Sequence, residues 1–568
     1  MVQIPSVRKK ISKPQQVFIL LLSGWFLINL LQAVFMEILS DEAYYGLYGK
    51  FLDWGYYDHP PMVALLVRIS SLVFSGNLGI RFMTIILQLG TILLIWKTLG
   101  LKNPDVSAVI SFFIISGSIS MFSAYGVITA PDAPLLFFTA LFLFLYKKFI
   151  DNQKWSTTLL LALSMAGLIY SKYQSVLVIG FIILADIRLL RSIKFWIAGL
   201  LALLLLSPHF YWQYTNNFPS FQYHLIDRAD SFDWKYFLEY LPNQMAVFNP
   251  LILGAAFYVI LKYKAENKFN RSLYLQIIGF IGFFWLTSFR GHVEPHWTIA
   301  CSIPMIILIS EKSIGNAALF RFTRKYLLPS VFLLIMIRIF LLIDSGLNKT
   351  LAFSGKKEKY KFIESVAGDL PVIFTGSFQK PSLYPFFTGK EATVISSVYS
   401  RLTQFDLWQF EVRHHNKPAF VCAEAEGRSM AYGSGRLGFS GFRTDSLQTV
   451  NRMKISFNLE DVSINPGDTV RISFNLSNPY NYDIDFNHRQ FPVWICIVLL
   501  KGDKKYSLGV ALSEPINIIS SGETVGRSLV LVMPEIPGGK YNLGISLSTL
   551  LGPSFNSHFT KVEIGSND

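Results

Sequence analysis

Acidic and phenolic side chains crowd one stretch of the sequence, LSDEAYYGLYGKFLDWGYYDHPPM at residues 39–62, directly after a long apolar run. Within it, Asp41, Tyr44, Tyr45 and Tyr48 follow the i, i+3, i+4, i+7 spacing of one helical face. The spacing predicts a helix with a carboxylate and three phenols along one wall. Such a wall can accept a proton and hydrogen-bond a polar substrate.

A second acid, Glu42, stands beside Asp41, and the dipeptide Asp58-His59 precedes the paired prolines that end the stretch. Acids are favoured in the first turn of a helix, so helix capping also explains Asp41 and Glu42. Capping does not explain Asp58 and His59, which lie beyond the predicted helix. A functional reading of the stretch is therefore favoured over a purely structural one.

Four further motifs place ionisable residues at the ends of apolar runs. TAPDAPL contains Asp132, IYSKYQS contains Lys172, segment 212–234 contains His224 and Arg228, and SFRGHVEPHW contains Arg290, Glu294 and His296. Taken singly, Asp132 fits a helix start, and Lys172 fits a lysine whose ammonium reaches the membrane surface. An ionisable residue within an apolar run is nevertheless a functional candidate.

Together these motifs combine carboxylates with cations. Asp41 and Asp132 can accept a proton from an attacking hydroxyl. Lys172, Arg228 and Arg290 suit a phosphate or diphosphate. The combination fits an anionic, partly apolar substrate, such as a lipid-linked phosphate that enters sideways from the bilayer.

A metal site is not predicted. His292, Glu294 and His296 are zinc-type ligands, but their alternate-residue spacing indicates extended backbone rather than a ligand cluster. The three cysteines are too widely separated to suggest a metal site or a disulfide framework.

The elements that must position these residues are membrane helices. The chain is 52% hydrophobic and 15% charged, which is too apolar for a typical soluble protein. Apolar runs of roughly 15–20 residues, the length that crosses a bilayer core, recur up to about residue 344. They predict about 11 spans, at 17–36, 82–97, 106–124, 133–149, 157–170, 173–187, 195–211, 243–261, 272–289, 297–310 and 326–344.

Charge sets the expected topology. The net charge of +14 is concentrated in alternate loops and before the first span, which is the positive-inside pattern rather than a sign of a nucleic-acid partner. The pattern puts the N-terminus in the cytoplasm and the motif-bearing loops outside. Segment 61–76 is short and carries Arg68, so we expect an interfacial helix there. No cleavage site follows the first apolar run, which favours a retained anchor.

The C-terminal part has a different composition. Residues 345–447 mix a charged helical stretch with strand-like segments and predict a small α/β domain. From about residue 448, short strand candidates alternate with Gly- and Asp-rich turns, which predicts a β-sandwich of immunoglobulin-like type over 448–568. The expected organisation is a catalytic membrane domain at 1–344 followed by these two extracytoplasmic domains.

Four motifs in order, SDEAYY…WGYYDHPPM, TAPDAPL, YSKYQS and VEPHW, resemble the membrane-embedded glycosyltransferases with the GT-C fold. The resemblance is to polyprenyl-phosphate-sugar enzymes related to bacterial aminoarabinose transferases and protein O-mannosyltransferases. It covers about residues 15–345.

The resemblance implies roles for several residues. In that family the acid after the first span is implicated in catalysis, and it maps to Asp41, with Glu42 beside it. The acid of the second external loop maps to Asp132, so the resemblance makes Asp41, Glu42 and Asp132 the catalytic candidates. The residue before the paired prolines helps to hold the donor phosphate; many relatives have Lys where this chain has His59. This departure shifts the phosphate assignment towards Lys172 and Arg290.

The remaining candidates, Tyr44, Tyr45, Asp58, His224, Glu294 and His296, are predicted to bind substrate. The expected activity is inverting transfer of a sugar from a polyprenyl-phosphate carrier to a hydroxyl of lipid A, a protein or a glycan, on the extracytoplasmic face of a bacterial inner membrane. The resemblance implies no required cofactor and is compatible with Mg²⁺ or Mn²⁺. The alternative is a transporter or flippase of a lipid-linked saccharide, although transporters place ionisable groups near the bilayer midplane rather than at one face.

Overall fold

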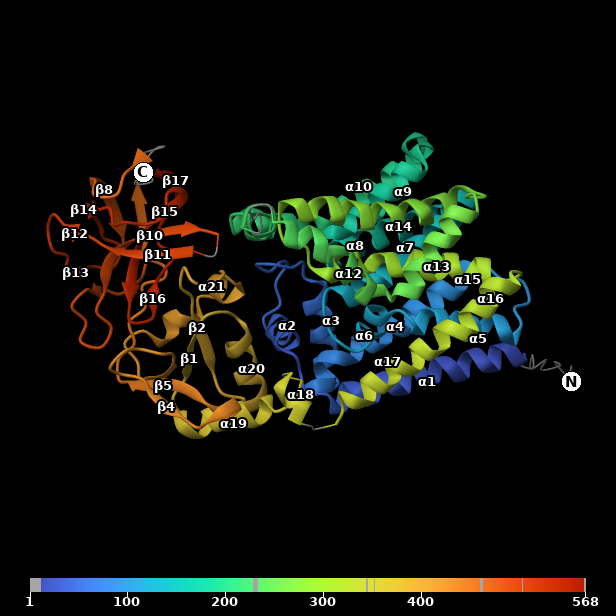
Figure 1. The fold of residues 1–568 in the computed structure, drawn as a ribbon, viewed down its shortest axis with the longest axis horizontal. Coiled ribbons are helices and arrows are strands. Elements are labelled where there is room, and N and C mark those ends of the chain that lie inside the picture. The colour runs from blue at the N-terminus through green and yellow to red at the C-terminus, as the bar shows by residue number, and fades with distance from the viewer. Residues whose placement is uncertain are drawn as a thin grey trace, which may run out of the picture. The chain divides into compact units, whose positions relative to one another are not determined.

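The computed structural model describes residues 12–227, 233–343, 346–351, 353–459, 463–502 and 504–565 (Figure 1). Contacts divide the chain into two compact units, Met1–Gly355 and Lys356–Asp568. Among the described residues, the first unit is helical and the sheets lie in the second. The division into three domains at 344 and 447 stays a prediction.

The first unit is built from helices joined by short connections. In chain order they are α1 (Lys13–Phe35), α2 (Ser40–Lys50), α3 (Met62–Ser71), α4 (Gly76–Leu99), α5 (Val106–Gly117), α6 (Ser120–Ala124), α7 (Asp132–Asp151), α8 (Trp155–Ser171), α9 (Val176–Ala185), α10 (Ile193–Thr215), α11 (Pro219–Gln222), α12 (Trp234–Phe248), α13 (Pro250–Lys262), α14 (Lys268–Thr287), α15 (Ser302–Ser313), α16 (Ala317–Phe322), α17 (Leu328–Phe340) and α18 (Gly346–Thr350). Short 3₁₀ segments, η1 (Tyr173–Ser175), η4 (Ser288–Arg290) and η5 (Pro295–Cys301), and the π-helical turn η3 (Tyr223–Asp227) lie between them.

All the predicted spans fall on helices. Within the described residues, five helices are long and apolar enough to cross a membrane on their own, namely α1, α4, α7, α10 and α14, and two bent helix pairs bring the number to seven. Further apolar helices are shorter than a bilayer core requires. The chain is therefore a multi-pass membrane protein, whereas the figure of about 11 spans stays a prediction.

The predicted span 243–261 is broken by a sharp bend. The run 243–261 divides into α12 and α13, which are bent by 97° at Asn249. Asn249 has φ +77°, and its side chain accepts a hydrogen bond from the amide of Leu251 at the start of α13. Pro250 then fixes the first position of α13. Hydropathy alone gave no sign of this bend, because Asn249 and Pro250 are isolated within an apolar run.

The core of the first unit holds α7 and α8 at its centre. α7 packs against α4 and α8, and α8 packs against α10. Buried apolar side chains from these helices and from α5, α13, α14 and α15 form one continuous cluster. The predicted interfacial helix corresponds to α3, which packs against α2 and α4.

The second unit begins with an α/β layer. Its sheet has the order β2-β1-β3-β5-β4, with the first three strands parallel. The strands are β1 (Val372–Thr375), β2 (Ala392–Ile395), β3 (Ala419–Cys422), β4 (Met430–Tyr432) and β5 (Phe439–Thr444), and the accompanying helices are α19 (Lys356–Ala367), α20 (Gln379–Thr388) and α21 (Gln404–Trp408).

Two larger sheets follow and enclose one apolar cluster, and a separate two-stranded sheet pairs β13 with β9. One sheet has the order β11-β10-β15-β17-β7, and the other has the order β12-β14-β8-β6. The strands are β6 (Lys454–Phe457), β7 (Ser463–Ile464), β8 (Thr469–Ser477), β9 (Ile484–Asp485), β10 (Trp494–Lys501), β11 (Lys504–Gly509), β12 (Ala511–Leu512), β13 (Ile518–Ile519), β14 (Thr524–Val532), β15 (Gly539–Thr549), β16 (Gly552–Pro553) and β17 (Thr560–Ile564). In β8, buried and exposed side chains alternate, as expected for a sheet with one face on the core.

Candidate active site

The helix α2 presents its two acids to different surroundings. Asp41 is exposed, whereas Glu42 is fully buried. Glu42 pairs with Arg81 of α4: its Oε1 accepts from Nε at 2.7 Å and its Oε2 from Nη2 at 2.5 Å. Its oxygens also accept hydrogen bonds from the amides of Leu39 (3.1 Å) and Thr129 (3.0 Å). Glu42 thus joins three chain segments, and its filled acceptor sites make it a poor candidate for a metal ligand.

The loop after α2 is held by side chains at the end of α10. Trp212 donates to Asp53 at 2.8 Å, and His209 contacts the carbonyl oxygen of Trp54 at 2.7 Å. Gly55 lies so close to the indole that a Cβ there would be 2.3 Å from Cε3 of Trp212. The loop therefore has a fixed position despite its lack of regular structure.

Asp58 is oriented by a phenol. Tyr48 of α2 donates to Oδ1 of Asp58 at 2.6 Å, and its ring stacks on Tyr56 with centroids 3.8 Å apart. On the other side, His224 of η3 contacts the Asp58 carbonyl oxygen at 3.0 Å. The predicted substrate-binding residues Asp58 and His224 thus lie together, and buried Tyr44 packs against Tyr48.

His59 is neutral at physiological pH. Burial lowers the pKa of its imidazole to about 4, and the positive charges of His224 and Lys172 act in the same direction. Its ring lies edge-on to Tyr45, with centroids 5.7 Å apart. At neutral pH, His59 can therefore offer a phosphate a hydrogen bond but not a charge.

Asp132 and Lys172 form a buried ion pair. Asp132 is the first residue of α7 and Lys172 follows the last residue of α8; their Oδ1 and Nζ atoms are 2.7 Å apart, and both side chains are 3% exposed. His296 of η5 approaches the second oxygen of Asp132 at 4.0 Å. The sequence predicted both residues of the pair but not their contact.

The pKa shifts of two tyrosines indicate that the carboxylates of the site lie near one another. Burial raises the pKa of Tyr45, and the negative charges of Asp41, Asp58 and Asp132 raise it further. Burial also raises the pKa of Tyr125, as do the charges of Asp132, Asp41 and Glu294. The first, second and last of the motif-bearing loops thus converge on one site.

Arg290 ends the segment η4 and is exposed. It pairs with no carboxylate in the part of the chain that the structure describes, so its charge is available to a ligand. His292 instead lies 3.7 Å from Glu294. Within the described residues, no three His, Cys, Asp or Glu side chains gather as a metal site would require. Arg228 lies outside the described residues.

Sequence reasoning missed two arginines that link helices of the first unit: Arg81 is fully buried, and Arg338 is half-buried. Arg81 donates to the carbonyl oxygens of Ala33, Met36 and Glu37 as well as to Glu42. Arg338 of α17 contacts the side chains of Asn29 and Gln32 in α1 and of Ser123 in α6. The available signal was a charge within an apolar run for Arg338 and a charge directly before such a run for Arg81.

Comparison with known proteins gives a family match and a fold. Residues 58–212 match the family model described as dolichyl-phosphate-mannose-protein mannosyltransferase. The structure resembles two solved structures of ArnT from Cupriavidus metallidurans, one in the apo state (TM-score 0.55) and one bound to undecaprenyl phosphate (TM-score 0.56). In each comparison the sequence identity is 13%, and the aligned region covers 76% of this chain and 98% of the ArnT chain. No curated protein matches the sequence.

The fold is that of the GT-C membrane glycosyltransferases, as the four motifs predicted. The family match covers TAPDAPL and YSKYQS as well as the segment from Asp58. The fold is thus one that membrane-embedded glycosyltransferases have, and residues 58–212 match a glycosyltransferase family model.

Proposed function

We propose that this protein transfers a sugar from a polyprenyl-phosphate carrier to a hydroxyl acceptor, with inversion at the anomeric carbon. The observation that carries the proposal is the exposed carboxylate of Asp41 beside the buried Asp132–Lys172 pair. The undecaprenyl phosphate bound to the similarly folded ArnT supports a lipid-linked donor. The acceptor belongs to lipid A, a protein or a glycan.

In this mechanism, Asp41 acts as general base. Its carboxylate accepts the proton of the acceptor hydroxyl as the oxygen attacks the anomeric carbon, and the bond from that carbon to the carrier phosphate breaks. The carrier phosphate leaves with its negative charge. Arg290 and Lys172 stabilise that charge, and His59 adds a hydrogen bond.

The other residues position these groups. Glu42 holds the start of α2, Asp132 fixes the ammonium of Lys172, and Tyr48 orients Asp58. No metal is assigned a step. Mg²⁺ or Mn²⁺ remains compatible with transfer, and metal dependence can be measured directly by adding a chelator.

We place the reaction at the extracytoplasmic face of a bacterial inner membrane, with the N-terminus in the cytoplasm. The support is the sequence: basic clusters occupy alternate loops, while the loops that carry Asp41, Asp132 and Lys172 are poor in Lys and Arg. The second unit would then also lie on the extracytoplasmic side.

The test is transfer by the purified, reconstituted protein from polyprenyl-phosphate sugars to a crude envelope acceptor fraction. Asp41→Asn should lower kcat by about 10²–10⁴, the usual contribution of a general base, with little change in donor KM. Arg290→Gln should mainly raise the donor KM.

Asp151→Asn is the matched control, because Asp151 is an exposed acid at the opposite end of α7. It should transfer sugar at the wild-type rate. Equal rates for Asp41→Asn and the wild type would refute the assignment of Asp41 as base. Absence of transfer by the wild type across a broad donor panel would refute the function itself.

A further inference from the structure

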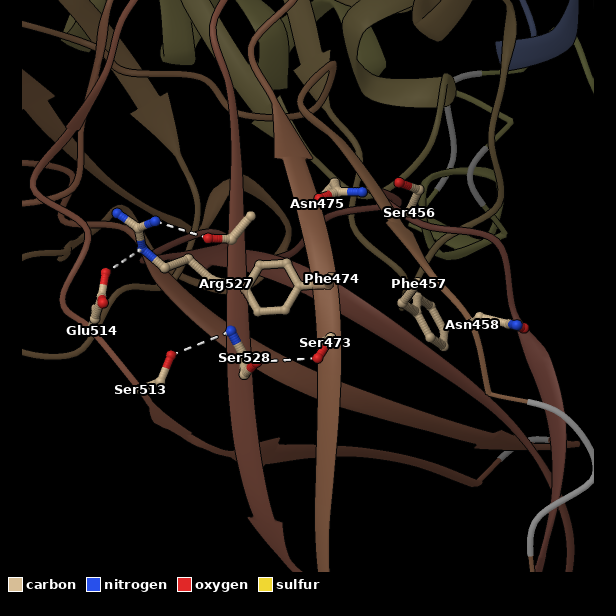
Figure 2. Close-up of a pocket in the computed structure, with 11 residues that line it drawn as sticks. Ser456, Phe457, Asn458, Ser473, Phe474, Asn475, Ser513, Glu514, Arg527 and Ser528 are labelled. Carbon is tan, nitrogen blue, oxygen red and sulfur yellow. Dashed lines mark hydrogen bonds and ion pairs between the residues drawn. The ribbon is translucent and has the colours of Figure 1, made fainter.

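A groove of about 620 Å³ opens on the four-stranded sheet β12-β14-β8-β6 of the second unit (Figure 2). Its size is in the range of small-molecule sites. Strand register places Asn475 of β8 opposite Gly526 of β14 on one side and Ser456 of β6 on the other. All three are exposed, so they line the outer face of the sheet rather than the core.

Small polar side chains make the groove both concave and rich in hydrogen-bonding groups. Gly526 leaves a gap between its neighbours: a Cβ there would meet Oδ1 of Asn475 at 3.3 Å. The side chains of Asn475 and Ser456 have no hydrogen-bond partner among the residues that the structure describes. An amide and a hydroxyl are therefore open to a ligand, each able to donate and to accept.

The next row of the sheet is a ladder of serines. The hydroxyls of Ser473 and Ser528 lie 3.1 Å apart, and the hydroxyl of Ser513 accepts a hydrogen bond from the amide of Ser528 at 3.3 Å. Figure 2 shows this ladder along one side of the groove. Hydroxyl groups thus extend across β8, β14 and the residue that follows β12. A surface of this width suits an extended ligand rather than a single ion.

The charges that line the groove balance. Nε of Arg527 lies 3.7 Å from the Glu514 carboxylate, and Arg527 also donates to the carbonyl oxygen of Gly526 at 2.8 Å. One cation beside one anion does not favour a polyanion such as a nucleic acid. Phe457 and Phe474 contribute to the lining but are buried in the core, so an apolar peptide would find no anchoring side chain.

We propose that this groove binds a neutral oligosaccharide. Sugar hydroxyls donate and accept hydrogen bonds at once, which matches a lining of amide and hydroxyl groups with no net charge. The role of that oligosaccharide as the acceptor glycan rests on the proposed function. The groove would then hold an acceptor chain by saccharide units other than the one that receives the new sugar.

The test uses the full-length protein in detergent on an array of defined oligosaccharides. The array carries neutral chains of hexoses, pentoses and N-acetylhexosamines, with heparin oligosaccharides as polyanionic controls. Affinity for any chain retained by the wild type is then measured for the variants Gly526→Gln, which fills the gap, and Asn475→Ala, which removes the amide. The matched control is Asn542→Ala, an exposed asparagine on β15 of the other sheet.

We expect the wild type to retain at least one neutral chain and both groove variants to bind it about tenfold or more weakly, with no change for Asn542→Ala. Retention of heparin alone, or of no neutral chain, would overturn the proposal, as would full affinity in Gly526→Gln. Saccharide binding by a protein that fails to transfer sugar would support the groove and count against the proposed function alone.

Discussion

The contact between Arg81 and Glu42 gives the sharpest prediction about what holds the site in place. Both side chains are fully buried, and the pair links α4 to the first turn of α2. Arg81→Met keeps the apolar length of the side chain but removes the charge that neutralises Glu42. It also removes the donors to three carbonyl oxygens at the end of α1.

The expected magnitude follows from burial. Removing one partner of a buried ion pair costs about 3–5 kcal/mol, because the other charge remains without compensation. Glu42→Gln should cost less, since the amide keeps an acceptor and the arginine keeps its three carbonyl partners. The double variant should be more stable than the sum of the two single effects predicts, by at least about 1 kcal/mol.

The assay is equilibrium unfolding in mixed micelles, with transfer activity measured in parallel. Arg68→Met is the control, because Arg68 is exposed on α3, and its effect should stay within about 0.5 kcal/mol. Loss of Arg81 should also lower kcat, since Asp41 precedes Glu42 in the same helical turn. Strictly additive single effects, or a loss below about 1 kcal/mol for Arg81→Met, would refute the assigned role of the pair.

Two further predictions concern other parts of the chain. Burial raises the pKa of the Glu411 carboxyl to about 7. Its protonated form therefore contributes fully to stability below about pH 4.5, and this contribution is lost as the pH rises through 7. Glu411→Gln should remove up to about 3 kcal/mol of this pH dependence from the free energy of unfolding of the second unit, whereas Glu426→Gln, at an exposed position, should not. Gly55→Ala should raise the donor KM and destabilise the first unit by about 1–3 kcal/mol, because the new Cβ would collide with Trp212. Gly24→Ala is the control, because a Cβ at Gly24 would meet open space. Equal effects of the two substitutions on unfolding and on KM would contradict this interpretation of the loop.

Much of the fold was predictable because membrane helices and strands leave direct traces in the sequence. The helix after Asp41 follows from phenol spacing, and the strand over 469–477 follows from alternation of apolar and polar residues. The bend at Asn249 was not predictable from hydropathy, since a positive φ and a side-chain cap are local features that the apolar average hides.

The site was predictable as a set of residue types but not as a set of contacts. Four motifs indicated which loops matter, and Asp132 and Lys172 were both candidates. Their pairing depends on the antiparallel packing of α7 and α8, which no spacing in the sequence encodes. Arg81 was missed because it stands next to an apolar run, where an arginine is easily read as the end of a span.

The Asp132–Lys172 pair also bears on how the chain enters the membrane. The two residues lie at the same end of the α7–α8 hairpin, 40 residues apart in sequence, so both must pass to the same side. Moving a separate carboxylate and a separate ammonium through hydrocarbon is expensive, whereas two charges that are already paired at the open end of the hairpin add no net charge there. The residues that serve the site thus favour insertion of α7 and α8 as one preformed unit rather than one helix after the other.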